Sequence, residues 1–217
     1  MTSLPLKNNI GYAVGFAIVL FFVAYSFVGA ATPSIILTWK TNNFYPSDFQ
    51  GKALPITGSV VTASAAVLRD GALTDPREIT FTWYLDDTWI TQELGKREVT
   101  VTASKLFGDA HFIRVVASLP TGERIDSSVK IPVTHPDLVI EVSEGESGNN
   151  DTLRAIPFFF NVGSLANLIF SWEIDGIKQS SQSNTLSLPS NLAPTVSVLA
   201  KNAANPLEFT KITVTLP

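Results

Sequence analysis

Cysteine is absent from the 217 residues of this sequence, so no disulfide can link one part of the chain to another. Small domains outside the cytoplasm often depend on such links. Any folded core must therefore be held by tryptophan and its aliphatic neighbours, without covalent help.

Charged residues are also scarce, at 16% of the chain, and the net charge at pH 7 is −4. The 15 lysines and arginines form no cluster, so the sequence lacks the basic footprint of a nucleic-acid-binding protein. We expect no nucleic-acid partner.

Catalytic motifs are missing as well: there is no Gly-x-Ser-x-Gly sequence and no phosphate-binding glycine loop. Asp86 and Asp87 are adjacent, and neighbours on a strand point to opposite faces, so they form no glycosidase pair unless a turn redirects them. His111 has no second ligand at metal-binding spacing, which favours a structural or exposed role. We expect no enzyme activity, no cofactor and no metal.

A long apolar run extends from Ile10 to Ala31, and no charged residue occurs between Lys7 and Lys40. As a helix it would span roughly 33 Å, enough to cross the ~30 Å hydrocarbon core of a bilayer. It is either a retained transmembrane helix or a signal peptide cleaved near Ala30 or Ala31, where small residues suit a signal peptidase. Under both alternatives Lys7 favours the cytoplasmic side, so the rest of the chain is expected outside the cytoplasmic membrane.

One short pattern occurs twice, at Phe81 to Asp87 and at Phe170 to Gly176. Both copies read aromatic, hydroxyl, Trp, any residue, aliphatic, Asp and a turn former. Large apolar residues at alternate positions predict a strand with one buried face, so Trp83 and Trp172 are expected in cores. The residues that end each copy can enter the left-handed region and turn the chain back.

We therefore predict an all-β fold with two tandem β-sandwiches, at residues 32–135 and 136–217, after the N-terminal helix at residues 1–31. The length of 217 residues allows two domains of about 100 residues each. The short junction near residues 133–138 favours a fixed, end-to-end arrangement. The other predicted strands are 35–39, 61–67, 99–103, 111–118, 125–133, 138–142, 152–160, 168–174, 185–188, 195–200 and 207–216.

Three aromatic residues outside the clean alternation are candidate contacts. Phe44 and Tyr45 lie in the long connection 40–57, where they either plug the end of the sandwich or contact a partner. Trp89 follows the first turn and is either a lid on the core or a contact residue.

Phe158, Phe159 and Phe160 are consecutive at the end of a predicted strand. Alternation forces at least one of them off the core face, where it needs a cover from the other domain, another subunit or a partner. Pro157 in the same strand predicts an edge strand or a bulge. The nearby acidic loop 143–151 has oxygens of the kind that calcium uses, but it lacks the spacing of a defined calcium loop, so we expect it to be solvated.

The stretch Phe170 to Gly176 resembles the aromatic-x-Trp-x-aliphatic-Asp-Gly signature of PKD-type and other immunoglobulin-like surface domains; the first copy departs from it at Asp87, where Gly is usual. The segments Gly51 to Pro55, Arg154 to Asp175 and Asn205 to Phe209 resemble a group of uncharacterised exported proteins of uncultured, small-genome bacteria. This second resemblance implies a bacterial cell-envelope protein with two immunoglobulin-like domains, and it carries no known activity or binding residue.

Together these features predict a non-catalytic, exported cell-envelope protein that acts as a structural or protein-interaction module, for example in a pilus or surface layer. Its partner would be another protein or a second copy of itself, in addition to the membrane. The alternatives are a glycan-binding surface module or adhesin, and a spacer that holds something away from the membrane.

Overall fold

The computed structural model describes residues 32–144, 150–189 and 193–216. Within these ranges the chain is all-β, as predicted, with two single-turn 3-10 helices, η1 (Pro76–Glu78) and η2 (Leu165–Asn167). The described residues contain no helix long and apolar enough to cross a membrane. The predicted N-terminal helix, its cleavage site and most of the acidic loop 143–151 lie outside them.

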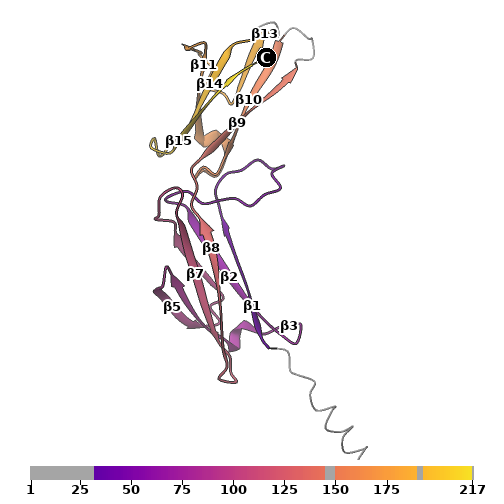
Figure 1. Ribbon diagram of the computed structural model, residues 1–217, viewed down its shortest axis with the longest axis vertical. Helices are drawn as coiled ribbons and strands as arrows, with labels where there is room; N and C mark the ends of the chain where they lie inside the picture. The colour runs from indigo at the N-terminus through magenta and orange to yellow at the C-terminus, as the bar shows by residue number, and fades with distance from the viewer. Residues whose placement is uncertain (1–31, 145–149, 190–192, 217) are drawn as a thin grey trace, which may run out of the picture.

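Two sheets face each other in the N-terminal half (Figure 1). In one, β2 lies between β1 and β6 and also pairs with β3; in the other, the order is β5-β4-β7-β8. All of these pairings are antiparallel. The strands are β1 (Ser34–Thr41), β2 (Val60–Arg69), β3 (Ala72–Leu73), β4 (Thr80–Leu85), β5 (Thr88–Leu94), β6 (Glu98–Thr102), β7 (Ala110–Ser118) and β8 (Arg124–Pro132).

The C-terminal half repeats this pairing order. Its sheets run β13-β10-β9 and β12-β11-β14-β15, so β9, β10 and β13 correspond to β1, β2 and β6, and the four-stranded sheets correspond strand for strand. The strands are β9 (Asp137–Glu144), β10 (Asn150–Phe158), β11 (Leu168–Ile174), β12 (Ile177–Lys178), β13 (Thr185–Pro189), β14 (Thr195–Asn202) and β15 (Phe209–Thr215). Two antiparallel sheets connected in this order are the arrangement of immunoglobulin-like sandwiches.

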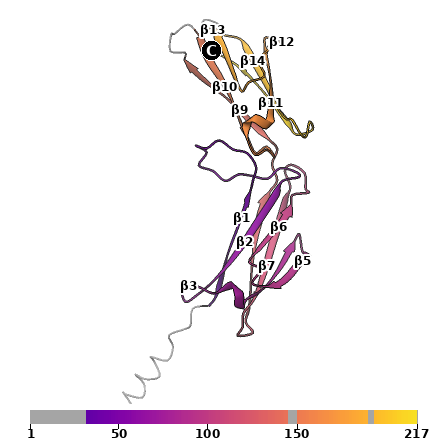
Figure 2. The same cartoon turned by 180° about the vertical axis from the view of Figure 1, so that it is seen from behind.

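Each half has its own hydrophobic core, and we call the halves the first and the second sandwich. Trp83 is fully buried in the first core and Trp172 in the second. The small inward residues of β2 that belong to the same core as Trp83 are Val61, Ala63, Ala65 and Val67. Figures 1 and 2 show the two sandwiches stacked end to end along the long axis.

Both sandwiches hold the central tryptophan in the same way. The indole N–H of Trp83 donates to the carbonyl of Lys96, and that of Trp172 donates to the carbonyl of Ser183, each at 2.8 Å. A buried indole needs such an acceptor, because an unpaired N–H would lose its hydrogen bond to water. The repeated sequence pattern therefore specifies a repeated polar contact as well as a repeated core residue.

One prediction about β10 is wrong. Pro157 was expected on an edge strand or at a bulge, but β10 lies between β9 and β13. The proline is tolerated there because β13 pairs only with residues 150–154, so at Pro157 the strand has β9 alone as a neighbour. The end of a central strand thus behaves locally as an edge.

Candidate interaction surface

The connection between β1 and β2, residues 42–59, leaves the first sandwich and reaches the second (Figure 2). Its Phe44 N–H donates to the carbonyl of Phe160 at 2.7 Å, and the N–H of Phe159 donates back to the carbonyl of Phe44 at 2.6 Å. Two reciprocal backbone bonds fix the position of this connection, which we call the bridging loop, against the end of β10.

Polar side chains buried at the junction add a second set of bonds. Asn43, only 3% exposed, donates to the carbonyl of Phe159 at 2.7 Å and to Oδ1 of Asn161 at 3.0 Å. Ser59 donates to the same Asn161 oxygen at 2.7 Å. Asn161, on the second sandwich, therefore binds two residues of the bridging loop at once.

The carboxylate of Glu208 also binds Asn161, through the Asn161 backbone. This side chain is 6% exposed, accepts from the Asn161 backbone N–H, and accepts from the amide of Asn202 at 3.1 Å. At the same junction, Ile56 and Thr134 form a parallel bridge. Buried polar groups that are all paired favour one arrangement over others, because every alternative leaves some of them unsatisfied.

Four aromatic rings gather beside these bonds. Phe49 lies 5.9 Å from Tyr45, 5.4 Å from Phe158 and 6.0 Å from Phe159, measured between ring centroids, and Phe158 and Phe159 are 5.9 Å apart. We call this group the aromatic platform. Tyr45 is 44% exposed, while Phe158 and Phe159 are half-buried. The structure thus brings together candidates from the bridging loop and from β10 that lie more than 100 residues apart in sequence.

Two of the candidate contacts face inward instead. Phe160 is fully buried in the second core, so its assignment as a candidate contact is wrong, and Phe44 is half-buried against the same core. Strict alternation would bury Phe159 after Ala155 and Pro157. The φ angle of Phe159 is +65°, however, which ends the strand and rotates the next residue into the core.

Two grooves flank the junction. One of about 430 Å³ lies beside the aromatic platform and is lined by Phe44, Pro46, Ser47, Asp48, Arg154, Ala155, Ile156, Pro157, Leu165 and Asn184. A second, of about 590 Å³, is lined by Ile56, Thr57, Leu106, Phe107, Thr134, His135, Pro136, Asn205, Leu207, Glu208 and Phe209. We call the second one the junction groove.

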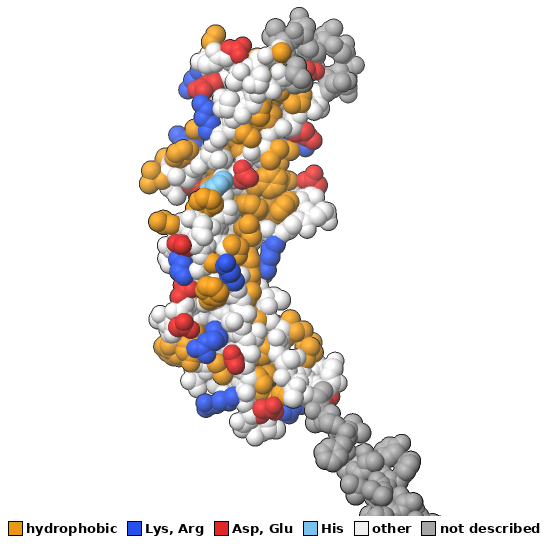
Figure 3. Space-filling view, viewed as in Figure 1, with side chains coloured by type: hydrophobic (Ala, Val, Ile, Leu, Met, Phe, Trp, Pro, Cys, Tyr) orange, Lys and Arg blue, Asp and Glu red, His pale blue; other side chains and the backbone are white. Residues whose placement is uncertain are grey.

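The junction groove carries strongly exposed apolar side chains, which the sequence reasoning missed. Leu207 is 88% exposed, Leu106 70%, Phe107 65% and Phe209 53%. The sequence does contain a signal for this surface, because Leu106 and Phe107 are apolar residues in a turn, directly before Gly108. Figure 3 shows hydrophobic side chains gathered around the waist between the two sandwiches.

Trp89 lies apart from the junction, on the outer face of the first sandwich. It belongs to the edge strand β5 and is 60% exposed, so it is not a lid on the core. It pairs with Tyr84, which pairs with Arg114, so the three side chains form one row across the sheet. The Arg114 guanidinium stacks 4.0 Å from the Tyr84 ring centre, and Trp89 is left as the open aromatic face of this row.

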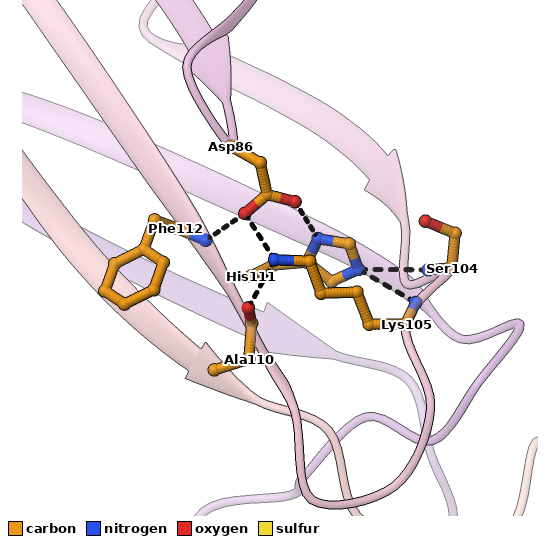
Figure 4. A network of polar contacts seen from close by, with 6 residues as sticks. All are labelled: Asp86, Ser104, Lys105, Ala110, His111 and Phe112. Atoms are coloured by element: carbon orange, nitrogen blue, oxygen red, sulfur yellow. Dashed lines mark hydrogen bonds and ion pairs between the residues drawn. The ribbon is translucent and has the colours of Figure 1, made fainter.

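His111 lies near the start of β7, and Figure 4 shows it within a network of polar contacts. It is 3% exposed, and its ring nitrogens contact Asp86 at 2.6 Å and the backbone N–H of Ser104 at 3.0 Å. The described residues contain no group of three or more histidines or carboxylates that could hold a metal ion. Its contacts with Asp86 and with the Ser104 backbone make His111 part of a polar network.

The carboxylate of Asp86 is the centre of that network. Partial burial raises its pKa, but hydrogen bonds from the Phe112 N–H, from Lys105 and from His111 outweigh burial, so the net pKa is lowered. Lys105 lies 2.9 Å from the Asp86 carboxylate. Asp86 is therefore an anion at neutral pH, stabilised by three donors.

Comparison with known proteins gives no family assignment. No protein-family model and no curated protein matches this chain, so the resemblance to exported proteins of small-genome bacteria stays a prediction. Among solved structures, the chain is similar to three N-terminal domains of the bacteriophage RB49 Highly Immunogenic Outer Capsid protein (Hoc), with a TM-score of 0.49, 13% identity and coverage of 85% of this chain and 59% of that chain. It is also similar to the fibronectin(III)-like modules of Clostridium thermocellum CbhA, with a TM-score of 0.32, 18% identity and coverage of 83% and 94%.

Proposed function

We propose that this chain is a non-catalytic, exported envelope protein of two tandem immunoglobulin-like domains, and that it works as a protein-interaction module. Such modules serve in many structural and recognition roles, so the proposal depends on the surface and not on the fold. The observation that carries it is the aromatic platform, where Tyr45 and its three phenylalanine neighbours gather at the junction.

Aromatic side chains at the centre of an exposed patch are the usual anchors of protein interfaces. The platform has the further advantage of rigidity, because reciprocal backbone bonds between Phe44 and the end of β10 hold the bridging loop. A preformed surface loses little conformational entropy when a partner binds. The partner can be a second copy of this chain or another envelope protein, such as a component of a pilus or surface layer.

Site-specific photo-crosslinking in the native envelope tests this proposal. A crosslinker at position 45 should give one dominant adduct, identified by mass spectrometry, whereas one at position 112 should not. Phe112 is a matched control, since it is 50% exposed and lies on β7, away from the platform. Tyr45→Ser should abolish association without unfolding the chain. Equal adducts at positions 45 and 112, or unchanged association of Tyr45→Ser, would contradict the proposal.

A glycan-binding module or adhesin is the second candidate, and the row of Trp89, Tyr84 and Arg114 favours it. An open indole face on one side of the Tyr84 ring and a guanidinium over that ring offer stacking and hydrogen bonding to a sugar. Glycan-array binding that Trp89→Ala abolishes and Tyr45→Ala leaves intact would favour this function over the first.

The proposal also includes attachment at the membrane through residues 1–31. The apolar run from Ile10 to Ala31 and the position of Lys7 support it. The intact mass and membrane partition of the protein from an export-competent host would distinguish a retained anchor from a chain cleaved near Ala30 or Ala31. A full-length species found in the soluble cytoplasmic fraction would contradict export altogether.

A further inference from the structure

Both histidines of the chain touch the same short segment, residues 104–109 between β6 and β7. His111 lies beneath it, buried, and His135 packs its ring edge-on against Phe107 at 4.6 Å between centroids. We call this segment the 104–109 loop. Its side chains Leu106 and Phe107 form part of the wall of the junction groove.

The partners of His111 determine where its proton sits. Nε2 accepts from the backbone N–H of Ser104 at 3.0 Å and from that of Lys105 at 3.3 Å (Figure 4). Nδ1 lies 2.6 Å from Oδ2 of Asp86, which is ionised and can only accept. The ring is therefore neutral, with its proton on Nδ1 and a bare Nε2 that holds the loop.

The surrounding charges keep this arrangement in place near neutral pH. Lys105 bonds both the Asp86 carboxylate and the carbonyl of Ala110, at 2.9 and 2.7 Å. Asp109, the other charged residue of the loop, bonds Leu106 and Val133 through its backbone. On β8 the residue opposite His111 is the apolar Ile131, and Asp87 of the adjoining turn faces Arg114.

We propose that His111 is an acid-sensitive latch for the 104–109 loop. A proton added to Nε2 turns the acceptor of two backbone N–H groups into a donor that faces both of them. Both hydrogen bonds must then break, while the bond from Nδ1 to Asp86 is retained and strengthened by the new charge. Acidification therefore releases Ser104 and Lys105 at the start of the loop, whereas β7, which carries His111, stays in place.

Release of the loop changes the junction groove. Other ties of the loop remain, among them the hydrogen bonds from the Thr57 hydroxyl to the carbonyl of Lys105 at 2.7 Å, from the Gly108 N–H to the carbonyl of Val133 at 3.1 Å and from the Val133 N–H to the carbonyl of Asp109 at 2.9 Å. Leu106 and Phe107 lie between these ties, so they gain freedom when the latch opens. The apolar wall of the groove is thus coupled to pH.

Hydrogen exchange of the full chain in detergent, followed by mass spectrometry at pH 7.5 and 5.0, tests the latch. After correction for the intrinsic pH dependence of exchange, the Ser104 and Lys105 amides, followed in peptides that cover residues 104–109, should lose protection about tenfold or more at pH 5.0, because both hydrogen bonds to His111 are lost. Peptides covering residues 175–184 contain no histidine and should keep their protection.

Two variants separate His111 from every other cause. In His111→Gln the side-chain amide can still accept from the loop and donate to Asp86 but does not titrate, so protection should be equal at both pH values. His135→Gln removes the other histidine and should keep the full acid response. An unchanged wild type, a response that persists in His111→Gln, or one abolished by His135→Gln would overturn the latch. If His111→Gln does not fold, an unchanged wild type or a response abolished by His135→Gln still overturns the latch.

Discussion

Asp86 joins three segments of the first sandwich through one carboxylate. It accepts the N–H of Phe112 at 2.9 Å, pairs with Lys105 and contacts His111. Asp175 occupies the corresponding turn of the second sandwich and accepts the N–H of Thr195 at 2.9 Å. The two aspartates thus share a backbone contact to the next strand, and Asp86 adds the side-chain network.

The pH dependence of stability should follow from Asp86. Its pKa is lowered in the folded chain, so the carboxylate contributes stability above the unfolded value of about 3.9, and this contribution is lost as the pH falls through the lower folded value. Asp86→Asn should reduce the free energy of unfolding at pH 7 by about 1–3 kcal/mol and flatten its decline below pH 5. Urea titrations from pH 7 to pH 3 would measure both effects. Asp175→Asn is the matched control, and an equal loss of slope there would show that the side-chain network is not the cause.

At the level of elements, both β-hairpin turns after the central tryptophans are left-handed at two successive residues. The φ angles are +48° and +62° at Asp86 and Asp87, and +47° and +79° at Asp175 and Gly176. Two such residues make a type I′ turn, which fits the twist of a β-hairpin. Aspartate at the second position is strained there, whereas glycine is not.

Exchanging the second turn residue between the repeats should therefore move stability in opposite directions. Asp87→Gly should raise the free energy of unfolding by about 0.5–1 kcal/mol, since the Asp87 side chain is 94% exposed and its contact to Arg114 is 4.0 Å long. Gly176→Asp should lower it by a similar amount, although a Cβ there meets no atom within 4 Å. Urea unfolding measures both. A loss on Asp87→Gly would mean that the weak contact to Arg114 outweighs backbone strain.

The strands were predictable because their alternation is local. Every predicted strand with stated bounds lies within two residues of an observed one at each end, and both turns were expected from their sequence. Strand β5 was missed because Trp89, Ile90 and Thr91 lack a clean period, and its register is interrupted by a bulge. The burial of Phe160 was missed because it depends on the positive φ of Phe159, which is fixed by bonds to Phe44 across the junction.

The candidate site was predictable only where its signal is local. Tyr45, Phe158 and Trp89 were identifiable as aromatics that alternation cannot bury. Their grouping was not, because Tyr45 and Phe158 are joined only through Phe49, and contacts between segments so distant in sequence leave no periodic signal. The His111 network was hidden for a similar reason, since its acceptors and donors come from three separate segments.

At the scale of the whole molecule, the junction determines whether the two sandwiches act as one rod or as two jointed bodies. The linker itself is short, because β8 ends at Pro132 and β9 begins at Asp137. Short linkers alone still permit bending. The added constraint is the buried set of Asn43, Ser59, Asn161 and Glu208, together with the Phe44–Phe160 bridge.

The absence of cysteine makes this rigidity straightforward to measure. Spin labels on Gln92→Cys in β5 and Lys178→Cys in β12, both exposed, report the distance between the sandwiches. We expect a narrow distance distribution in the otherwise unchanged chain and a broad one after Asn161→Ala. That change removes the oxygen that accepts from Asn43 and Ser59, so buried Ser59 loses its acceptor and Asn43 keeps only its bond to the carbonyl of Phe159. Asn42→Ala is the control, since Asn42 is exposed beside Asn43 and its loss should leave the distribution narrow. A narrow distribution in Asn161→Ala would assign the rigidity to the backbone bridge and the aromatic platform instead, and a partner would then dock on the very contacts that hold the molecule straight.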